Sequence, residues 1–442
     1  MKTQIAIIGG GVSGMTAAFY LHKKGIPFVL LEKEGKSGGA LKSDWQKGYS
    51  LERGANTVAM NAELQEIIQD LGLESEIEVP FESSHKRYIY RNGRLHALTQ
   101  SPLSLFKSSL LGRSAKWRLA QEPFVSSKSN GEESVAEFFS RRIGKEAYEY
   151  LVAAGLQGVY AGIPEQMHMK SVMPALVQME EEKGSLLKGL IARQKEAKRS
   201  GAPKRSIFAI KGGMNRLAEK IREVCGDSIQ TGKEVKKLIK ADAGYQLVTE
   251  QGIIEAEQVV YAAPAYAAYM LEEMSPELSR ALLRIPYAPM VLLHLAYDAN
   301  ALGQEVDGFG FLIPPKEDTA LLGAIWNSGI FAERTPENHL LFTLFVGGAR
   351  QPELDPENSQ SHIDKARKEF EKIMGIESSP TFQDLSFWKN AIPQYNMQHP
   401  EILDEIRQAK EALPDFHLIG NFIQGVSVGD CVARAKKLVD SL

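Results

Sequence analysis

The stretch Gln4–Gly14 (QIAIIGGGVSG) decides the fold of this chain of 442 residues. Its apolar, β-branched start predicts a short buried strand at 4–9, and the apolar spacing of 13–24 predicts a helix directly after it. A second buried strand, with the sequence FVLLE, is predicted at 28–32. A strand, a helix and a strand joined by such tight connections form one βαβ unit with parallel strands.

Three glycines in this unit have the spacing of a dinucleotide fingerprint. Gly9 permits a tight turn, Gly11 lets a pyrophosphate approach the backbone, and Gly14 allows the helix to pack closely on the strand. The start of the helix, which contains Ser13, offers free N–H groups to phosphate. Glu32 ends the second strand, where a carboxylate accepts hydrogen bonds from a ribose diol and repels a 2′-phosphate. The fingerprint therefore predicts a site for NAD or FAD, and by itself does not separate the two.

The composition is that of an ordinary globular protein, with 43% hydrophobic and 24% charged residues. A net charge of −3 argues against a general nucleic-acid binder. Two cysteines, Cys225 and Cys431, cannot form a disulfide framework and fit a reducing compartment. We find neither a signal-peptide pattern nor the run of about 20 apolar residues that a spanning helix requires. We expect a cytoplasmic protein that can still lie on the inner face of a membrane, and no metal site.

The pattern along the chain predicts an α/β architecture, α+β overall. We expect a Rossmann-type dinucleotide domain that is split along the chain by a helical insert and a mixed-sheet substrate domain. Asn92-Gly93 predicts a hairpin turn, and the breaker-rich run at 198–206 predicts a linker. The expected parts are dinucleotide domain at 1–82, 201–265 and 386–442, hairpin at 83–98, helical insert at 99–200 and second sheet at 266–385.

Several further segments resemble one known family. They include LQGVYAGIPE at 156–165, FAIKGGM at 208–214, WKNAIPQY at 388–395 and GNFIQGVSVGDC at 420–431. With these and Gly38-Gly39, the chain resembles the protoporphyrinogen oxidase family over almost its whole length. That family includes bacterial coproporphyrinogen oxidases and belongs to the FAD-dependent amine-oxidase superfamily. The resemblance implies FAD as the cofactor.

The resemblance also implies which residues contact FAD. The last helix, starting near Ser427, would aim its N–H groups at the charge that a reduced flavin carries near N1, or would simply pack on the sheet. We expect Asp430 to act in its first turn and Cys431 to be buried packing. Trp388 would border the flavin ring or be a core aromatic. The expected contacts are Glu32, Lys33, Gly39 and Ala40 near ribose and pyrophosphate, Gly54, Ala55, Asn56 and Thr57 along the flavin, Val235 at the adenosine end, and Gly425, Val426, Ser427 and Val428 at the last helix.

The substrate implied by the resemblance is a porphyrinogen, a large apolar macrocycle with carboxylate side chains. Protoporphyrinogen IX would be oxidised to protoporphyrin IX with dioxygen as acceptor and hydrogen peroxide as product, and coproporphyrinogen III is the alternative. Asn56 would orient the substrate or relay a proton, or would be a turn residue. Further candidates are Arg94 or His96 for a propionate, Gly158, and Leu312 and Phe331 as an apolar clamp or simple core.

Residues 83–120 carry eight Lys or Arg and no Asp or Glu. We expect most of these cations to form a solvated face, with propionate capture and membrane contact as the functional alternatives. Peripheral membrane contact would use 100–120, through Leu103, Leu105, Phe106, Leu110, Leu111 and Trp117. Whether the chain forms a homodimer stays open. The competing functions are another flavin oxidase, of amines or carotenoid precursors, and a non-enzymatic FAD-fold carrier.

Overall fold

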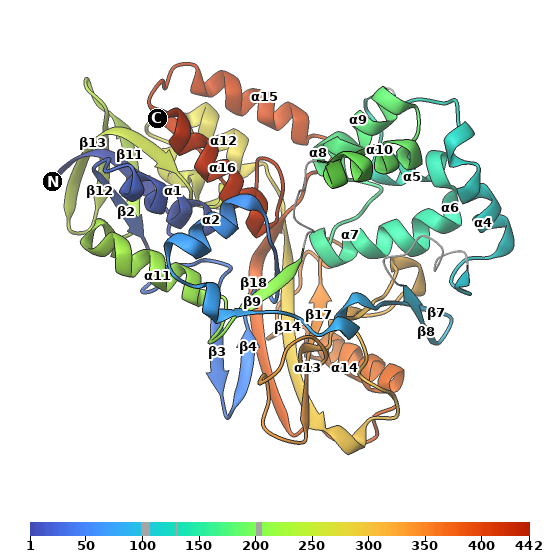
Figure 1. Ribbon diagram of the computed structural model, residues 1–442. Helices are drawn as coiled ribbons and strands as arrows, with labels where there is room; N and C mark the ends of the chain where they lie inside the picture. The colour runs from blue at the N-terminus through green and yellow to red at the C-terminus, as the bar shows by residue number, and fades with distance from the viewer. Residues whose placement is uncertain (99–106, 130, 200–205) are drawn as a thin grey trace.

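The computed structural model describes residues 1–98, 107–129, 131–199 and 206–442, arranged as two large sheets and a group of helices (Figure 1). The first sheet, at the left of Figure 1, has the strand order β10-β2-β1-β13-β12-β11, with β19 beside β13. Its strands are β1 (Lys2–Ile8), β2 (Phe28–Glu32), β10 (Ile229–Thr231), β11 (Val235–Lys240), β12 (Tyr245–Thr249), β13 (Gly252–Tyr261) and β19 (Phe416–Leu418).

Helices cover both faces of this sheet because its central strands are apolar on both sides. Ile5 and Ile7 of β1 face one hydrophobic core, and Ala6 and Ile8 face the other. The first core is covered by α1 (Val12–Lys23), α11 (Asn215–Cys225) and α16 (Val428–Ser441). The second is covered by α12 (Pro276–Leu283) and α15 (His399–Lys410). Since β1 and β2 pair in parallel around α1, the predicted βαβ unit is confirmed.

The second sheet, at the lower centre of Figure 1, has the order β18-β14-β17-β16-β15-β7-β8. The predicted hairpin forms its edge, because β7 pairs in parallel with β15. One face is covered by α14 (Gln360–Met374). The strands are β7 (Arg87–Arg91), β8 (Arg94–Leu98), β14 (Tyr287–Asp298), β15 (Gly310–Leu312), β16 (Leu321–Ile325), β17 (His339–Gly347) and β18 (Phe382–Pro393).

Two expected domain boundaries differ from the observed arrangement. β18 pairs with β14 along its length, so the second sheet continues through Pro393 instead of ending at 385. The helical residues 265–283 pack on the first sheet, whereas we assigned them from 266 onward to the second domain. Both differences arise because the sequence shows which residues are apolar without showing which sheet they face.

Short elements join the two sheets. β3 (Ser43–Gln46) and β4 (Tyr49–Glu52) form a hairpin. β9 (Ile207–Ile210), at the end of the predicted linker, pairs with β5 (Val58–Ala59) and β6 (Ile77–Glu78). The helices here are α2 (Ala62–Asp70) and α13 (Asn327–Ile330).

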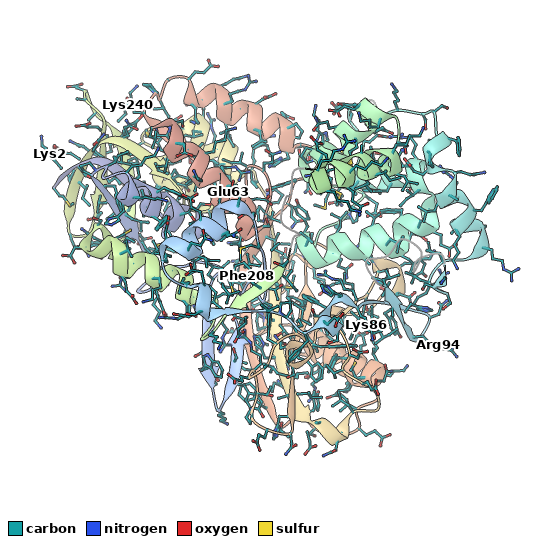
Figure 2. All side chains as sticks on the ribbon, in the orientation of Figure 1. Lys2, Glu63, Lys86, Arg94, Phe208 and Lys240 are labelled. Carbon is teal, nitrogen blue, oxygen red and sulfur yellow. The ribbon has the colours of Figure 1, made fainter. Side chains whose placement is uncertain are left out.

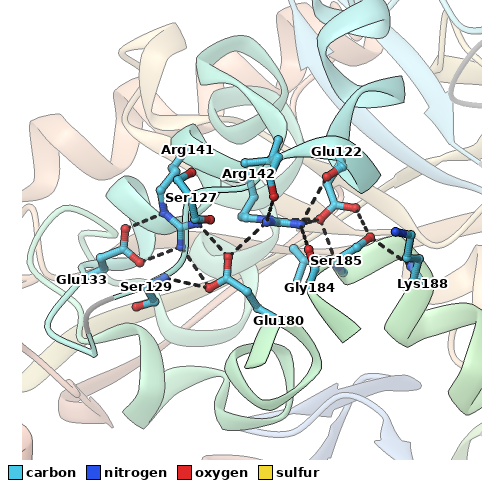
Figure 3. Close-up of polar contacts among 12 residues, drawn as sticks. Glu122, Ser127, Ser129, Glu133, Arg141, Arg142, Glu180, Gly184, Ser185 and Lys188 are labelled. Carbon is cyan, nitrogen blue, oxygen red and sulfur yellow. Dashed lines mark hydrogen bonds and ion pairs between the residues drawn. The ribbon is translucent and has the colours of Figure 1, made fainter. Parts of the chain in front are cut away.

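The predicted helical insert lies at the upper right of Figure 1. Arg142 and Glu122 form an ion pair in its interior, and Arg142 also lies 3.2 Å from Glu180 (Figure 3). Its helices are α4 (Arg113–Ala120), α5 (Val135–Ile143), α6 (Lys145–Ala147), α7 (Ala153–Tyr160), α8 (Met169–Val172), α9 (Pro174–Lys183) and α10 (Leu186–Arg199), with a π-helical turn at Tyr148–Val152.

The segment expected to contact a membrane is only partly exposed. Leu110 and Leu111 are buried in the core of the helical insert, so their expected role as membrane contacts is wrong. Trp117 of α4 is exposed, while Leu103, Leu105 and Phe106 lie outside the described residues. None of the helices in the described part of the chain is long and apolar enough to cross a membrane. Peripheral membrane contact stays a prediction.

Candidate cofactor and substrate site

The glycine fingerprint has the geometry that its spacing predicted. A Cβ at Gly14 would lie 1.9 Å from the carbonyl oxygen of Gly9, so α1 packs too closely for any side chain there. Gly9 has a φ of +103°, and a Cβ there would lie 2.8 Å from the Ala263 nitrogen. At Gly11 a Cβ would have no protein atom within 4 Å. Gly9 and Gly14 therefore serve packing, while Gly11 leaves its backbone open to a ligand.

Two further segments meet this loop at the carboxyl end of β1. The Gly38 N–H donates to the Gly10 carbonyl at 2.7 Å, and a Cβ at Gly39 would lie 3.0 Å from Cα of Gly11. On the other side, a Cβ at Gly54 would lie 2.2 Å from the Ala40 carbonyl oxygen, which accepts from the Ala55 N–H. Segments 9–14, 38–40 and 54–57 thus form one continuous backbone surface, at the edge where open α/β sheets bind ligands.

Glu32 lies beside the glycine loop, as its place at the end of β2 predicted. Its carboxylate accepts from the Gly10 N–H at 2.6 Å and from the Glu34 N–H at 2.8 Å. Lys33 is exposed and lies 3.8 Å from Glu34. Val235 begins β11 with its side chain buried, which leaves its backbone as the part available to a ligand. The Lys233 N–H donates to the Glu32 carbonyl, so the two segments expected at the adenosine end are adjacent.

A second helix begins close to α1. Ser427 caps α16 by accepting from the Asp430 N–H at 3.1 Å, and the Asp430 carboxylate accepts from the Ser427 hydroxyl at 2.6 Å. This capping box confirms the first-turn role expected for Asp430. Gly425 supplies the left-handed turn before Val426, with a φ of +70°. The positive end of the α16 dipole can therefore stabilise a nearby negative charge.

Cys431 packs where α16 meets α1, as expected. Burial raises the pKa of its thiol, so the thiol stays protonated and unreactive at neutral pH. Ser13 of α1 contacts the same thiol, which places this predicted cofactor residue between the two helices.

Asn56, Thr57 and Phe331 line one small cavity between the two sheets, so the structure brings these three candidates together. The cavity is also lined by two buried charges that the sequence analysis missed, Glu52 and Arg334. Glu52 accepts from the Ser43 hydroxyl at 2.5 Å and lies 3.7 Å from Arg334. Burial raises the pKa of Glu52 to about 7. Its place in the segment LERGAN, directly before Gly54, was the only sequence signal for it.

This raised pKa makes the stability depend on pH. The folded state binds the Glu52 proton more tightly than the unfolded state, so stability is lost as pH rises from 4.5 through about 7. An amide does not ionise, so the stability of Glu52→Gln should not change with pH in this way. We therefore expect the free energy of unfolding of Glu52→Gln, measured relative to wild type, to be about 2 kcal/mol higher at pH 8 than at pH 5. Urea unfolding at both pH values measures this, with the exposed Glu337→Gln as control. If the difference in free energy of unfolding between wild type and Glu52→Gln is the same at both pH values, the prediction is wrong.

Gly158 and Leu312 are also brought together. A Cβ at Gly158 would lie 2.8 Å from Cδ2 of Leu312, so α7 touches β15 at this glycine. Trp388 is half-buried and donates from its indole N–H to the Arg53 carbonyl at 2.7 Å, directly before Gly54. It also packs against Met290 and Leu292. Trp388 therefore borders the segment expected along the flavin and packs on the second sheet at the same time.

The two residues predicted to bind a propionate lie farther out. Arg94 is exposed at the hairpin end, at the margin of the molecule (Figure 2). His96 pairs with Ile89, which in turn pairs with Leu312, so His96 and Leu312 are two strands apart. The Nδ1 of His96 is 3.0 Å from the Ser109 hydroxyl. Neither residue lines the cavity at Asn56.

Arg87 is a better placed cation that the sequence analysis did not single out. Its guanidinium lies 4.5 Å from the centre of the Phe309 ring, which packs against the same core as Phe331. It has no ion-pair partner among the described residues, whereas Lys86 pairs with Asp307 and Arg91 with Glu146. Arg87 is an exposed residue, and the protein atoms packed around its guanidinium still lower its pKa by desolvation. Arg94 also has no ion pair in the described part of the chain, so the contact with Phe309 is what sets Arg87 apart, and a linear run of cations does not contain that contact.

Together, the glycine surface, two adjacent helix starts and a carboxylate at the end of β2 define a dinucleotide-binding protein. The particular family follows from comparison with known proteins. The family model for flavin containing amine oxidoreductases matches residues 12–440, and the chain belongs to this family. The protein is thus an FAD-dependent oxidoreductase, and the predicted cofactor is confirmed. The open backbone at Gly11 and the starts of α1 and α16, which contain Ser13 and follow Ser427, fit such a cofactor.

The relatives match over most of their own length. The chain is 30% identical to protoporphyrinogen oxidase 2, chloroplastic/mitochondrial, of Arabidopsis thaliana, over 99% of this chain and 93% of that one. It is 27% identical to coproporphyrinogen III oxidase of Bacillus subtilis (strain 168), over 99% and 97%. A solved structure from Exiguobacterium sp. 255-15 has a TM-score of 0.79 over 99% of this chain and 98% of that one, and at 23% identity it shows the fold.

Proposed function

We propose that the protein oxidises a porphyrinogen to the corresponding porphyrin, with protoporphyrinogen IX as the first substrate to test and coproporphyrinogen III as the alternative. The relatives described above are named for these two substrates. The structural observation that supports the proposal is a half-buried apolar face beside the segment expected along the flavin.

This apolar face belongs to the second sheet, next to the end of α7. Its exposed parts can pack against a ligand because several members are only partly covered by the protein. A saturated tetrapyrrole is large and apolar, so it gains free energy by leaving water for such a face. Trp388 joins the face to the Gly54 segment through its bond to the Arg53 carbonyl. The apolar face consists of Ala161, Met290, Leu292, Leu322, Phe345, Trp388, Ala391 and Ile392.

The reaction converts one porphyrinogen and three dioxygen into one porphyrin and three hydrogen peroxide, which balances six hydrogens and six electrons. When bound, FAD would accept hydride equivalents from the substrate, and dioxygen would then reoxidise the cofactor. The protein has to orient the macrocycle and exclude water, and aromatisation supplies the driving force. In this proposal Gly9–Gly14 and the start of α16 hold the cofactor, the apolar face holds the macrocycle, and Arg87 holds a carboxylate.

The direct test is the initial rate of porphyrin fluorescence in air, with each porphyrinogen supplied separately to the FAD-loaded protein. We expect a rate above the autoxidation control, with matching peroxide. Fluorescence that never exceeds this control, although FAD is bound, would contradict the proposal. Turnover of an amine instead would favour another flavin oxidase, and no turnover of any substrate would favour a carrier.

Replacing Arg87 tests the carboxylate contact. We expect Arg87→Ala to raise KM about tenfold or more with a smaller change in kcat, because a charged hydrogen bond contributes about 1.5–3 kcal/mol. Arg94→Ala is the matched control and should stay within twofold of wild type, since Arg94 lies beside the Asn92-Gly93 turn, at the opposite end of the hairpin from Arg87. A larger effect at Arg94 than at Arg87 would show that the carboxylates bind at the hairpin end.

A further inference from the structure

A buried chain of four polar side chains leads from Asn56 into the second sheet. Asn56 and Asn327 are each 8% exposed, and Thr343 and His294 are fully buried. Asn327 begins α13, while Thr343 and His294 face each other across β17 and β14. The sequence separates Asn56 from the other three by more than 200 positions, so the chain exists only in the folded protein.

A single fixed acceptor at one end sets the direction of every hydrogen bond in the chain. The Gly54 carbonyl can only accept, so Asn56 turns its Nδ2 toward it, at 3.3 Å. The Oδ1 of Asn56 then faces Asn327, whose Nδ2 donates to it at 2.9 Å. This leaves the Oδ1 of Asn327 facing Thr343, whose hydroxyl donates to it at 2.8 Å.

The same reasoning determines the tautomer of His294. Thr343 has one hydroxyl proton, and the amide oxygens near it are those of Asn327 at 2.8 Å and Asn56 at 3.5 Å. Since both can only accept, the Thr343 oxygen must itself accept from His294 Nδ1 at 3.1 Å. His294 therefore carries its proton on Nδ1, and its buried Nε2 has no hydrogen-bond partner among the described residues. Burial lowers the pKa of His294 to about 4, in agreement with a neutral ring at pH 7.

We propose that Asn327, Thr343 and His294 are positioning residues that lock the carboxamide of Asn56, with its oxygen turned inward and one N–H left to donate into the site. The part of this inference that concerns the porphyrinogen rests on the proposed function. The lock also decides between the two functional roles, substrate orientation and proton relay, that the sequence left open for Asn56 beside that of a turn residue. A carboxamide whose oxygen is held by Asn327 orients a ligand acceptor through its N–H, and does not take a proton from the substrate.

Thr343→Val tests the lock because valine has nearly the shape of threonine but no hydroxyl. Asn327 loses the donor to its Oδ1 and holds the Asn56 oxygen less firmly, and the remaining contact of Asn56 with the Gly54 carbonyl, at 3.3 Å, is too long to fix the carboxamide alone. With FAD still bound, we expect kcat to fall about 10- to 100-fold with KM within about threefold, as for a misplaced orienting group. Thr343→Ser keeps the hydroxyl and should stay within about threefold of wild type in both parameters.

Two readouts do not depend on turnover. The visible absorption bands of bound FAD should shift in Thr343→Val and not in Thr343→Ser, because Asn56 lies in the segment expected along the flavin. Nitrogen-15 spectra of the histidine rings should give a neutral Nδ1–H tautomer for His294 at pH 7, assigned by its absence in His294→Leu. Should Thr343→Val fail to fold, His294→Asn and His294→Leu replace it, since asparagine keeps a donor near Nδ1 and leucine does not.

Unchanged kcat and an unchanged FAD spectrum in a folded Thr343→Val, or an Nε2–H tautomer at His294, would overturn the inference. If the wild-type protein oxidises no porphyrinogen, the proposed function fails by itself. In that case the FAD spectrum and the histidine tautomer still decide whether the lock exists.

Discussion

Gly11→Ala is expected to fold as stably as the wild type and to lose its FAD. The position tolerates a side chain, because Gly11 has a φ of −73° and a Cβ there would meet no protein atom within 4 Å. The same methyl group would occupy the space through which a pyrophosphate reaches the backbone. We expect the Kd for FAD to rise about 100-fold or more, which corresponds to about 2.7 kcal/mol.

Gly14→Ala should behave in the opposite way. Its Cβ would lie 1.9 Å from the Gly9 carbonyl oxygen, so α1 would have to move away from β1 and the unliganded protein would lose stability. The neutral control is Gly155→Ala in α7, where a Cβ also meets no atom within 4 Å. Thermal unfolding of the unliganded proteins and titration with FAD separate the two effects. Wild-type FAD affinity in Gly11→Ala would show that the cofactor approaches elsewhere.

Removing Arg142 should have the largest effect on the stability of the helical insert. Its side chain is 1% exposed and bonds from Nε to the Glu122 carboxylate at 2.9 Å (Figure 3). Arg142→Ala leaves the buried Glu122 without its countercharge, and breaking such a pair costs about 3–5 kcal/mol. Arg407→Ala is the control, because the Arg407–Asp404 pair is exposed and should contribute at most about 1 kcal/mol.

The ionised state of Glu122 adds a pH dependence to this test. Burial opposes ionisation, but hydrogen bonds from Ser185, Arg142 and two backbone N–H groups hold the pKa of Glu122 below its usual value of 4.5. This stabilisation is therefore present above pH 4.5 and is lost as pH falls through the lower folded-state value. Hydrogen exchange of α5 and α10 at pH 7 and pH 4 measures it. Equal protection in wild type and Arg142→Ala at pH 7 would contradict the prediction.

Local patterns in the sequence determined the cofactor half of the site. The unit from β1 to β2 lies within one short stretch, so its apolar strands, Gly9, Gly11, Gly14 and Glu32 could be placed without any knowledge of distant contacts. The capping role of Asp430 and the buried state of Cys431 were predictable for the same reason, because a helix start depends on neighbouring residues.

Only the tertiary structure decided the rest. β14 is apolar at nearly every position because it is covered on both faces, so alternation could not show that His294 faces Thr343. The contacts of Glu52 with Arg334 and of Asn56 with Asn327 join segments more than 200 residues apart. Arg87 differs from Lys86 and Arg91 in lacking an acidic partner, and those two obtain theirs from distant segments. Pairing of this kind depends on which segments the two sheets bring together, and a linear pattern of charge and hydropathy does not contain it.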